Sequence, residues 1–308
     1  MITIPETDLL VHQLCLGGNV FGWSADESQS HQVLGAYHAG GGNFIDTADV
    51  YSEWKDGNIG GESETIIGTW MQKNNNRTEM VIATKVAKLT TRAGLSPSNI
   101  MAACDDSLRR LQTDYIDLYY SHDDDPNTPI EETLGAYDKL ITAGKIRYIG
   151  ASNFTPERLQ QSLNISESHQ LPTYVAVQDH YNLIHRKSVE GALSKVLDHH
   201  GMSVLPYFGL ARGFLTGKYR PGLEVDSMRA QGVKEYANPK NWAIIEALDL
   251  ISKNHNCSIS AVALGWLRAN PLVSTPLASA TTTEQVSEIM QIISLTSEEV
   301  AELNALSA

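Results

Sequence analysis

Residues 14–22 read Leu14-Cys15-Leu16-Gly17-Gly18-Asn19-Val20-Phe21-Gly22, a brief apolar run that leads into glycines. The run predicts a first β-strand over residues 14–16. A doubly wound α/β sheet usually follows its first strand with GxGxxG and places an acidic residue about 20 positions further on. The glycines here lack that spacing, so the stretch favours the other common α/β fold, a (β/α)8 barrel.

Strand-like and helix-like segments alternate from one end of the chain to the other. The strand-like runs are short, β-branched or aromatic, and without polar alternation, which is typical of parallel strands buried on both faces. The predicted strands are residues 14–16, 43–46, 81–85, 116–120, 146–151, 174–178, 202–205 and 272–276. The predicted amphipathic helices are residues 29–40, 98–111, 130–143, 156–163, 186–199 and 243–254. Eight strands with intervening helices predict a TIM barrel, as a single domain spanning residues 1–308.

Two segments depart from a bare barrel. Residues 1–13 precede the first strand and are expected to form a short hairpin that closes the barrel bottom. The interval between Leu205 and Leu272 is too long for one loop and one helix. It predicts a long loop at about 216–240 and two helices, with Cys257-Ser258 opening the second. Long loops on the C-terminal face of a barrel tend to shape substrate pockets.

Composition excludes several classes of function. A hydrophobic content of 42% and a charged content of 19% are those of an ordinary globular protein. The formal charge of −13 argues against a nucleic-acid or anionic-membrane surface. No apolar run approaches the ~20 residues of a membrane span, and the N-terminus lacks the pattern of a signal peptide. Three scattered cysteines indicate reduced thiols, and no metal-ligand spacing is present, so we expect a cytoplasmic protein without a metal site.

Four polar residues lie at, or just beyond, the ends of three of these predicted strands: Asp46, Tyr51, Lys85 and His122. In a barrel the C-terminal strand ends share one face, where active sites lie. Taken singly, each residue has a structural explanation, such as an N-cap role for Asp46. The coincidence of a carboxylate, a phenol, an ammonium and an imidazole favours a group that donates a proton to a carbonyl.

The chemistry of carbonyl reduction assigns a role to each of the four. Hydride transfer leaves negative charge on the carbonyl oxygen, which a positioned acid must neutralise. Tyr51 is a plausible donor, although an ordinary phenol has a pKa near 10. We expect Lys85 to lower the pKa of Tyr51 and Asp46 to hold that lysine protonated and oriented. A neutral His122 would donate an N–H to the substrate carbonyl.

Several motifs together resemble one known family. They are Gly42-Asn43-Phe44-Ile45-Asp46-Thr47-Ala48-Asp49-Val50-Tyr51, Gly61-Glu62-Ser63-Glu64-Thr65-Ile66-Ile67-Gly68, Ala83-Thr84-Lys85, Tyr119-Tyr120-Ser121-His122, Gly150-Ala151-Ser152-Asn153-Phe154 and Tyr207-Phe208-Gly209-Leu210-Ala211-Arg212-Gly213-Phe214-Leu215-Thr216-Gly217-Lys218. In this order, and over essentially the whole chain, the sequence is similar to the aldo-keto reductases. The resemblance is greatest to the bacterial and plant branches related to potassium-channel β subunits.

The resemblance implies a nicotinamide cofactor and the residues that hold it. Ser152, Asn153 and Gln178 would bind the carboxamide, and Tyr207 would stack on the nicotinamide ring, which hydride transfer requires to be held rigidly. The candidates for the pyrophosphate are Leu210, Arg212, Gly213, Thr216 and Lys218.

The adenosine end departs from the family's usual pattern. Ser279 and Thr281 stand where the family often has a lysine or arginine for the 2′-phosphate. Their hydroxyls, and a helix expected to start near Thr282, could still bind a phosphate, while Gln285 and Glu288 could contact the adenine. The resemblance favours NADP as cofactor, with NAD possible.

The predicted activity is reduction of small aldehydes or ketones, and two alternatives remain. One is a nicotinamide-binding sensor with slow turnover, as the resemblance to channel β subunits permits. The other is a barrel hydrolase that uses paired carboxylates such as Asp46 and Glu53, which would give Lys85 and Tyr51 no role. Around the predicted cleft, Asp123-Asp124-Asp125 indicates a solvated loop or a polar pocket wall. Each of three aromatic residues could line an apolar substrate site or pack in the core: Trp23, Trp54 and Tyr236.

Overall fold

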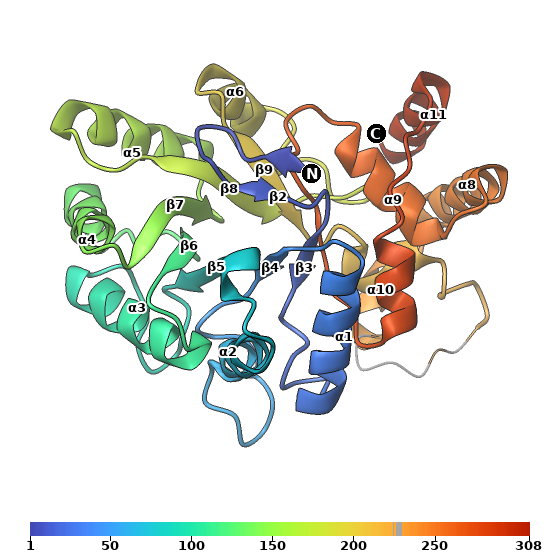
Figure 1. The fold of residues 1–308 in the computed structure, drawn as a ribbon. Helices are drawn as coiled ribbons and strands as arrows, with labels where there is room; N and C mark the ends of the chain where they lie inside the picture. The colour runs from blue at the N-terminus through green and yellow to red at the C-terminus, as the bar shows by residue number, and fades with distance from the viewer. Residues whose placement is uncertain (224, 226–229) are drawn as a thin grey trace.

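Eight parallel strands form the central sheet of the computed structural model, which describes residues 1–223, 225 and 230–308 (Figure 1). In spatial order the strands are β10 (Leu277–Ala278), β3 (Cys15–Gly17), β4 (Phe44–Asp46), β5 (Val81–Val86), β6 (Ile116–Ser121), β7 (Ile146–Ser152), β8 (Tyr174–His180) and β9 (Ser203–Tyr207). A parallel bridge between Val204 of β9 and Val273, just before β10, brings the two edges together. The predicted TIM-barrel fold is therefore confirmed.

Helices surround the strands, and most of them follow a strand in the chain (Figure 1). They are α1 (Glu27–Ala39), α2 (Glu62–Asn74), α3 (Pro97–Leu111), α4 (Ile130–Thr142), α5 (Pro156–His169), α6 (Ala192–His199), α7 (Ala230–Val233), α8 (Pro239–His255), α9 (Ile259–Arg268), α10 (Thr283–Ile289) and α11 (Ser297–Ser307). Short 3-10 helices are η1 (Arg77–Glu79), η2 (Ala211–Thr216) and η3 (Lys234–Tyr236). None of the helices in these ranges has the length and apolarity needed to cross a membrane.

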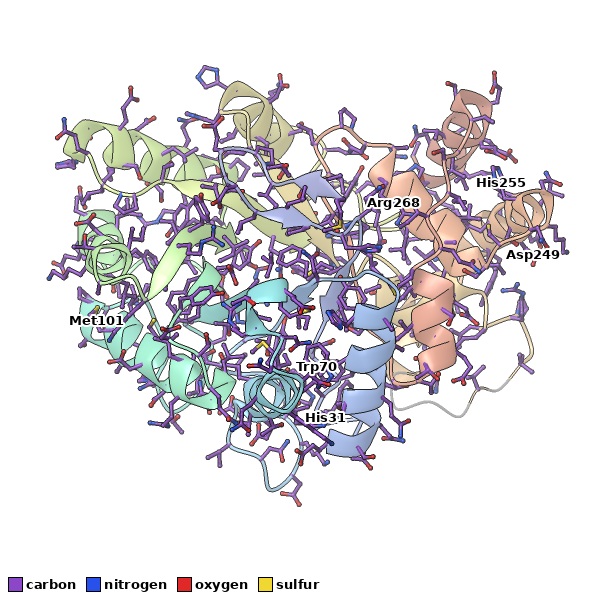
Figure 2. The ribbon with its side chains drawn as sticks, viewed as in Figure 1. His31, Trp70, Met101, Asp249, His255 and Arg268 are labelled. Carbon is purple, nitrogen blue, oxygen red and sulfur yellow. The ribbon has the colours of Figure 1, made fainter. Side chains whose placement is uncertain are left out.

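Local sequence signals explain where these helices begin. The side chain of Asp26 accepts the backbone N–H of Gln29 at the start of α1, and the Gln29 side chain accepts the N–H of Asp26 in return. Ser96 caps α3 and Thr155 caps α5, each followed by a proline at the first helical position. Figure 2 shows His31 and Trp70 where α1 faces α2.

The eighth strand lies later than the sequence predicts. It was expected at residues 272–276, and the structure places β10 at Leu277–Ala278. Within the expected range only Val273 pairs with a neighbouring strand, through the bridge to Val204. Pro276 has no N–H for a ladder, and its carbonyl accepts the N–H of Cys15 at 3.0 Å, so regular pairing with β3 starts one residue later.

A hairpin precedes the barrel, as predicted. The antiparallel strands β1 (Ile2–Thr3) and β2 (Leu10–Val11) form it, and Ile4, Leu9 and Val11 belong to the cluster inside the barrel. Ile4 and Leu9 of the hairpin are buried there beside Phe44 and Val81, which lie at the N-terminal ends of their strands. The hairpin therefore closes the barrel bottom, opposite the strand ends that carry the polar residues.

The segment after β9 contains the two predicted helices α8 and α9, the second capped by Ser258. The predicted loop at about 216–240 is interrupted by η2, α7 and η3, and its residues 224 and 226–229 lie outside the described residues. One predicted helix, residues 186–199, begins too early. The helix starts at Ala192, because Gly191 adopts φ 125°, which ends any helical path into it.

Two helical glycines give a matched test of the contact between α2 and α3. A Cβ on Gly68 would lie 2.3 Å from the backbone oxygen of Arg110, whereas a Cβ on Gly35 would meet nothing within 4 Å. We expect Gly68→Ala to destabilise the fold by about 1–3 kcal/mol, because backbone atoms cannot give way. Gly35→Ala should stabilise it by about 0.5–1 kcal/mol through helix propensity. Urea unfolding of both variants measures the difference, and equal midpoints would contradict this account.

Candidate active site

The four predicted catalytic residues meet at the C-terminal end of the barrel. Asp46 is the last residue of β4, and its backbone pairs with Ala83 of β5. Lys85 lies two residues further along β5, and His122 follows directly after β6. Tyr51 comes from the turn after β4. Parallel pairing of three adjacent strands therefore brings the four side chains to one place.

The ammonium of Lys85 is the centre of this cluster. Lys85 is fully buried and its Nζ donates to three acceptors: Asp46 Oδ2 at 2.7 Å, the Thr47 carbonyl at 2.7 Å and the Tyr51 hydroxyl at 2.9 Å. These contacts use all three donors of the ammonium. The Tyr51 hydroxyl in turn donates to Asp46 Oδ2 at 3.2 Å. The phenol is thus oriented by a buried ion pair.

The second oxygen of the Asp46 carboxylate is held by Gln178. The amide Nε2 of Gln178, on β8, donates to Asp46 Oδ1 at 2.8 Å, and both residues are buried. A residue predicted to bind the cofactor therefore also holds the Asp46 carboxylate from across the barrel. The two residues are 132 positions apart in the chain, and no local pattern signals this contact.

Burial controls the protonation of the cluster. Burial raises the pKa of Tyr51 well above its usual value, and the Asp46 carboxylate adds to the rise. The pKa of Tyr51 is therefore raised overall, opposite to the net lowering expected from the Lys85 ammonium. Burial lowers the pKa of Lys85, and the contact with Asp46 opposes that shift. Tyr51 consequently carries its proton at neutral pH, as a general acid must.

His122 agrees with the neutral imidazole expected from the sequence. Burial lowers its pKa well below the usual value, and the charges of Lys85 and Lys88 add to the effect. Its Nδ1 is buried and hydrogen-bonds to no residue in the described part of the chain. Its ring lies edge-on to Tyr51 with 5.9 Å between centroids. An uncharged ring nitrogen beside the phenol can align a carbonyl oxygen.

One cavity of about 1200 Å³ joins this cluster to the far end of the barrel face. Of the seventeen predicted catalytic and cofactor-binding residues, only Lys85, which is buried beneath Asp46 and Tyr51, is absent from its wall. Trp23 and Trp54 also line it, whereas Tyr236 packs against Phe214 away from the wall.

The middle of the cavity carries the residues predicted for the nicotinamide. Asn153, with a left-handed φ of 58°, donates to the carbonyl of His122 at 2.9 Å and to Ser152 Oγ at 3.0 Å. Its Oδ1 accepts the hydroxyl of Tyr207 at 2.8 Å. These bonds use both amide hydrogens of Asn153, so only its oxygen retains capacity for a further partner.

Two histidines stack beside Tyr207. The rings of His180 and Tyr207 lie 5.5 Å apart at 20°, and His185 lies 3.8 Å from His180 at 7°. Burial lowers the pKa of His180 to about 4, so the inner ring of this stack is neutral. The stack supports the ring of Tyr207 at the cavity wall. The stack was not predicted, since no residue pattern around His180 or His185 indicates it.

A strained loop follows β9 and carries the candidates for the pyrophosphate. Phe208, Ala211 and Arg212 have φ values of 53°, 47° and 56°, a conformation that residues with a Cβ rarely adopt. The guanidinium of Arg212 lies over the ring of Phe208 and 3.4 Å from Glu235. Lys218 forms no ion pair with any residue that the structure describes. Two cations are therefore available at this part of the wall.

Hydroxyl and amide groups line the far end of the cavity. Ser279 Oγ donates to Asn19 Oδ1 at 2.6 Å, and the N–H of Thr281 donates to Gln285 Oε1 at 2.8 Å. Glu288 lies on the same wall. Asn19 was not predicted, although it follows the first strand and the strand-end rule that found Asp46 applies to it equally.

Asp49 is a buried acid directly behind the catalytic turn. Its backbone N–H donates to the carbonyl of Lys85 at 3.2 Å, and both carboxyl oxygens are buried without a partner among the described residues. Burial, together with the nearby Glu64, raises the pKa of Asp49 to about 8. Asp49 is therefore mostly protonated at neutral pH.

A barrel that presents an acid-base cluster beside a long cavity for a dinucleotide defines a class of nicotinamide-dependent oxidoreductases. The comparisons give the family. Residues 13–308 match the model of the Aldo/keto reductase family, and this chain belongs to that family. It is accordingly an NAD(P)H-dependent oxidoreductase.

Three relatives cover nearly the whole chain. Protein tas of Escherichia coli is 33% identical, over 98% of this chain and 96% of its own length. The uncharacterized oxidoreductase YrpG of Bacillus subtilis is 32% identical, over 95% of this chain and 90% of its own. A probable voltage-gated potassium channel subunit beta of Oryza sativa is 30% identical, over 94% and 90% respectively. The predicted resemblance to the branch related to channel β subunits is confirmed.

Removing one partner of the buried ion pair should lower the free energy of unfolding more than removing both partners. Asp46→Asn leaves the ammonium of Lys85 uncompensated, and we expect a loss of about 3–5 kcal/mol in the free energy of unfolding. The double variant Asp46→Asn/Lys85→Met should recover most of that loss without recovering turnover. Urea unfolding followed by circular dichroism measures both. Full stability of the single variant would contradict the assigned pairing.

Asp49 should make stability depend on pH. Between the ordinary carboxyl pKa and about 8, the folded state keeps the proton of Asp49 while the unfolded state releases it, so rising pH favours unfolding. Asp49→Asn removes this effect, and its stability relative to wild type should rise by up to about 1.4 kcal/mol per pH unit between pH 5 and 7. Asp56→Asn, at an exposed site in the same loop, is the control. A pH-independent difference for Asp49→Asn would exclude a raised pKa.

Proposed function

We propose that this protein reduces small aldehydes or ketones to alcohols with NADPH, and that Tyr51 is the general acid. The observation that carries the proposal is the position of the Tyr51 hydroxyl, which accepts from Lys85 and donates to Asp46 at the end of the cavity. A phenol that lines the cavity, keeps its proton and is oriented in this way can give that proton to the oxygen of a bound carbonyl.

The residues of the cavity fit a nicotinamide dinucleotide. The supported ring of Tyr207 offers a stacking face, Arg212 and Lys218 offer positive charge for a pyrophosphate, and the hydroxyls of Ser279 and Thr281 face the far end. When bound, the cofactor supplies the hydride. Ser152 and Gln178 would then orient the carboxamide, and Leu210, Gly213 and Thr216 would allow the backbone to approach the phosphates.

During the reaction the chain's own groups handle charge and protons. His122 donates an N–H to the carbonyl oxygen and aligns it. As negative charge develops on that oxygen, Tyr51 transfers its proton, and the ammonium of Lys85 stabilises the phenolate that remains. Asp46 holds the ammonium in place throughout. The rings of Trp54 and His122 lie edge-on to the phenol and shield part of it from water.

NADPH is the proposed form of the cofactor, and the family resemblance supports it. At the far end the described wall offers hydroxyls, Gln285 and Glu288 rather than a cation, so a 2′-phosphate would be held by neutral donors. Comparison of the dissociation constants for NADPH and NADH tests this part of the proposal; tighter binding of NADH would reject it. We further propose that the chain forms one catalytic domain. We also propose a cytoplasmic location, because three free cysteines suit a reducing compartment.

A second candidate is a nicotinamide-binding sensor with slow turnover. It is favoured by the similarity to the rice protein whose name describes a channel subunit. Consumption of NADPH with methylglyoxal and 4-nitrobenzaldehyde separates the two functions. Tight cofactor binding with negligible turnover on every aldehyde would favour the sensor.

Tyr51→Phe tests the proposed acid directly. The change removes only the hydroxyl, and general-acid catalysis typically contributes about 10²–10⁴-fold, so we expect kcat to fall by that factor. The dissociation constant for NADPH should change little, because the phenol does not hold the cofactor. Fluorescence titration of NADPH and steady-state kinetics measure the two effects. Turnover near that of wild type would reject Tyr51 as the acid.

A further inference from the structure

Beside His122 the cavity wall carries an ammonium group that the proposed reaction does not use. Lys88 lines the same cavity as Tyr51, His122 and Trp54. Its side chain is 36% exposed, unlike the fully buried Lys85 three residues earlier. A cation at this place faces the substrate rather than the catalytic ion pair.

The backbone before Lys88 is strained. Strand β5 ends at Val86, whose carbonyl accepts the N–H of His122 at 2.8 Å. The next residue, Ala87, has a φ of 120°, which is costly for any residue with a Cβ. Its carbonyl accepts the N–H of Gly94 at 2.9 Å, which helps to fix the turn. Such strain persists at ligand sites where the surroundings hold it, and here it turns the chain so that Lys88 reaches the cavity wall.

The acidic groups nearby leave part of this ammonium available. Asp123 Oδ2 lies 3.2 Å from Lys88 Nζ, but Asp123 is 47% exposed and is not part of the cavity wall. The other acid, Glu53, already accepts the backbone N–H of Thr90 at 3.3 Å and the hydroxyl of the same residue. Lys88 has three N–H donors and one ion-pair partner among the described residues. It can therefore bind a ligand oxygen as well.

Several apolar side chains lie on the same wall, alongside the polar Ser24, Glu53 and Thr90. Trp23 and Trp54 meet edge to face with 5.8 Å between centroids, and Val20 and Val50 line the same cavity. This wall suits the body of an aromatic or aliphatic molecule. Because the chain carries a formal charge of −13, an anionic substrate needs a local cation to enter.

We propose that Lys88 is a specificity-determining residue that selects carbonyl substrates bearing a carboxylate on an apolar body. The apolar part lies against the two tryptophans while the carboxylate contacts the ammonium. Asp123 holds Lys88 in place and competes with the substrate for it. The inference rests on the proposed reduction of carbonyls, and it names the class of compound that the site takes.

The test compares 2-, 3- and 4-carboxybenzaldehyde with their methyl esters, which keep the ring and lose the charge. The quantity measured is the ratio of kcat/KM for each acid to that for its ester. Loss of a charge-assisted hydrogen bond in Lys88→Met should lower the ratio about tenfold for at least one acid. Lys88→Arg should retain it, and Asp123→Asn should raise it, because the ammonium is freed from its partner.

Binding of the same three acids to the NADP⁺-loaded enzyme, measured by calorimetry, separates this inference from the proposed function. If the acids bind through Lys88 but neither acids nor esters are reduced, the proposed function fails and the anion site stands. If the esters are reduced and the ratio in Lys88→Met stays within twofold of wild type for every acid, the anion site is rejected. Acid binding that does not change in Lys88→Met also rejects it.

Discussion

The ion pair between Lys85 and Asp46 is the interaction on which the rest of this site depends. Both groups are removed from water, so their mutual contact and the further bonds to Thr47 and Tyr51 must offset a large desolvation cost. Every donor of the ammonium is used, and Gln178 occupies the second carboxylate oxygen. Because the donors and acceptors of this cluster already have hydrogen-bond partners, its side chains have little freedom to rearrange. The phenol of Tyr51 is therefore held in one orientation before any substrate binds.

Hydrogen bonds also link the acid-base residues to those predicted to hold the nicotinamide. Gln178 contacts Asp46 on one side and lies in the predicted nicotinamide region on the other. Asn153 similarly contacts His122 and Tyr207. The groups proposed to handle the proton and those proposed to hold the cofactor thus share hydrogen bonds in two sets, one around Asp46 and one around Asn153.

Much of this arrangement can be predicted from the sequence, because the C-terminal ends of parallel strands all lie on one face of the barrel. Asp46, Lys85 and His122 each end or follow a predicted strand, and that pattern alone places them on one face. The eighth strand could not be located in the same way, since Pro276 interrupts the pairing that the apolar residues 272–276 suggest. The start of α6 was missed for a similar reason, the backbone angle of Gly191.

Electrostatic properties were harder to predict than positions. The pKa of Tyr51 depends on how completely its neighbours exclude water, and a sequence shows the neighbours without showing their packing. Lys88 was not predicted because it lies in a loop beyond β5, where contact with the cavity depends on the turn that precedes it. For Lys88 that turn rests on the unusual φ of Ala87, which no residue pattern announces.

The short strand β10 has a consequence for the whole molecule. Strand β10 has two residues, and a single bridge from Val204 to Val273 joins β9 to the segment before it. The junction between β9 and β10, which we call the seam, therefore has few backbone pairs to hold it. Tyr207 lies on one side of this seam and Ser279 on the other, and both line the long cavity. A dinucleotide bound across this junction would contact both sides of it and stabilise the pairing reversibly. Binding of the cofactor would then slow amide hydrogen exchange in β9 and β10 more than elsewhere. Cofactor supply would then set the lifetime of the fold as well as its activity.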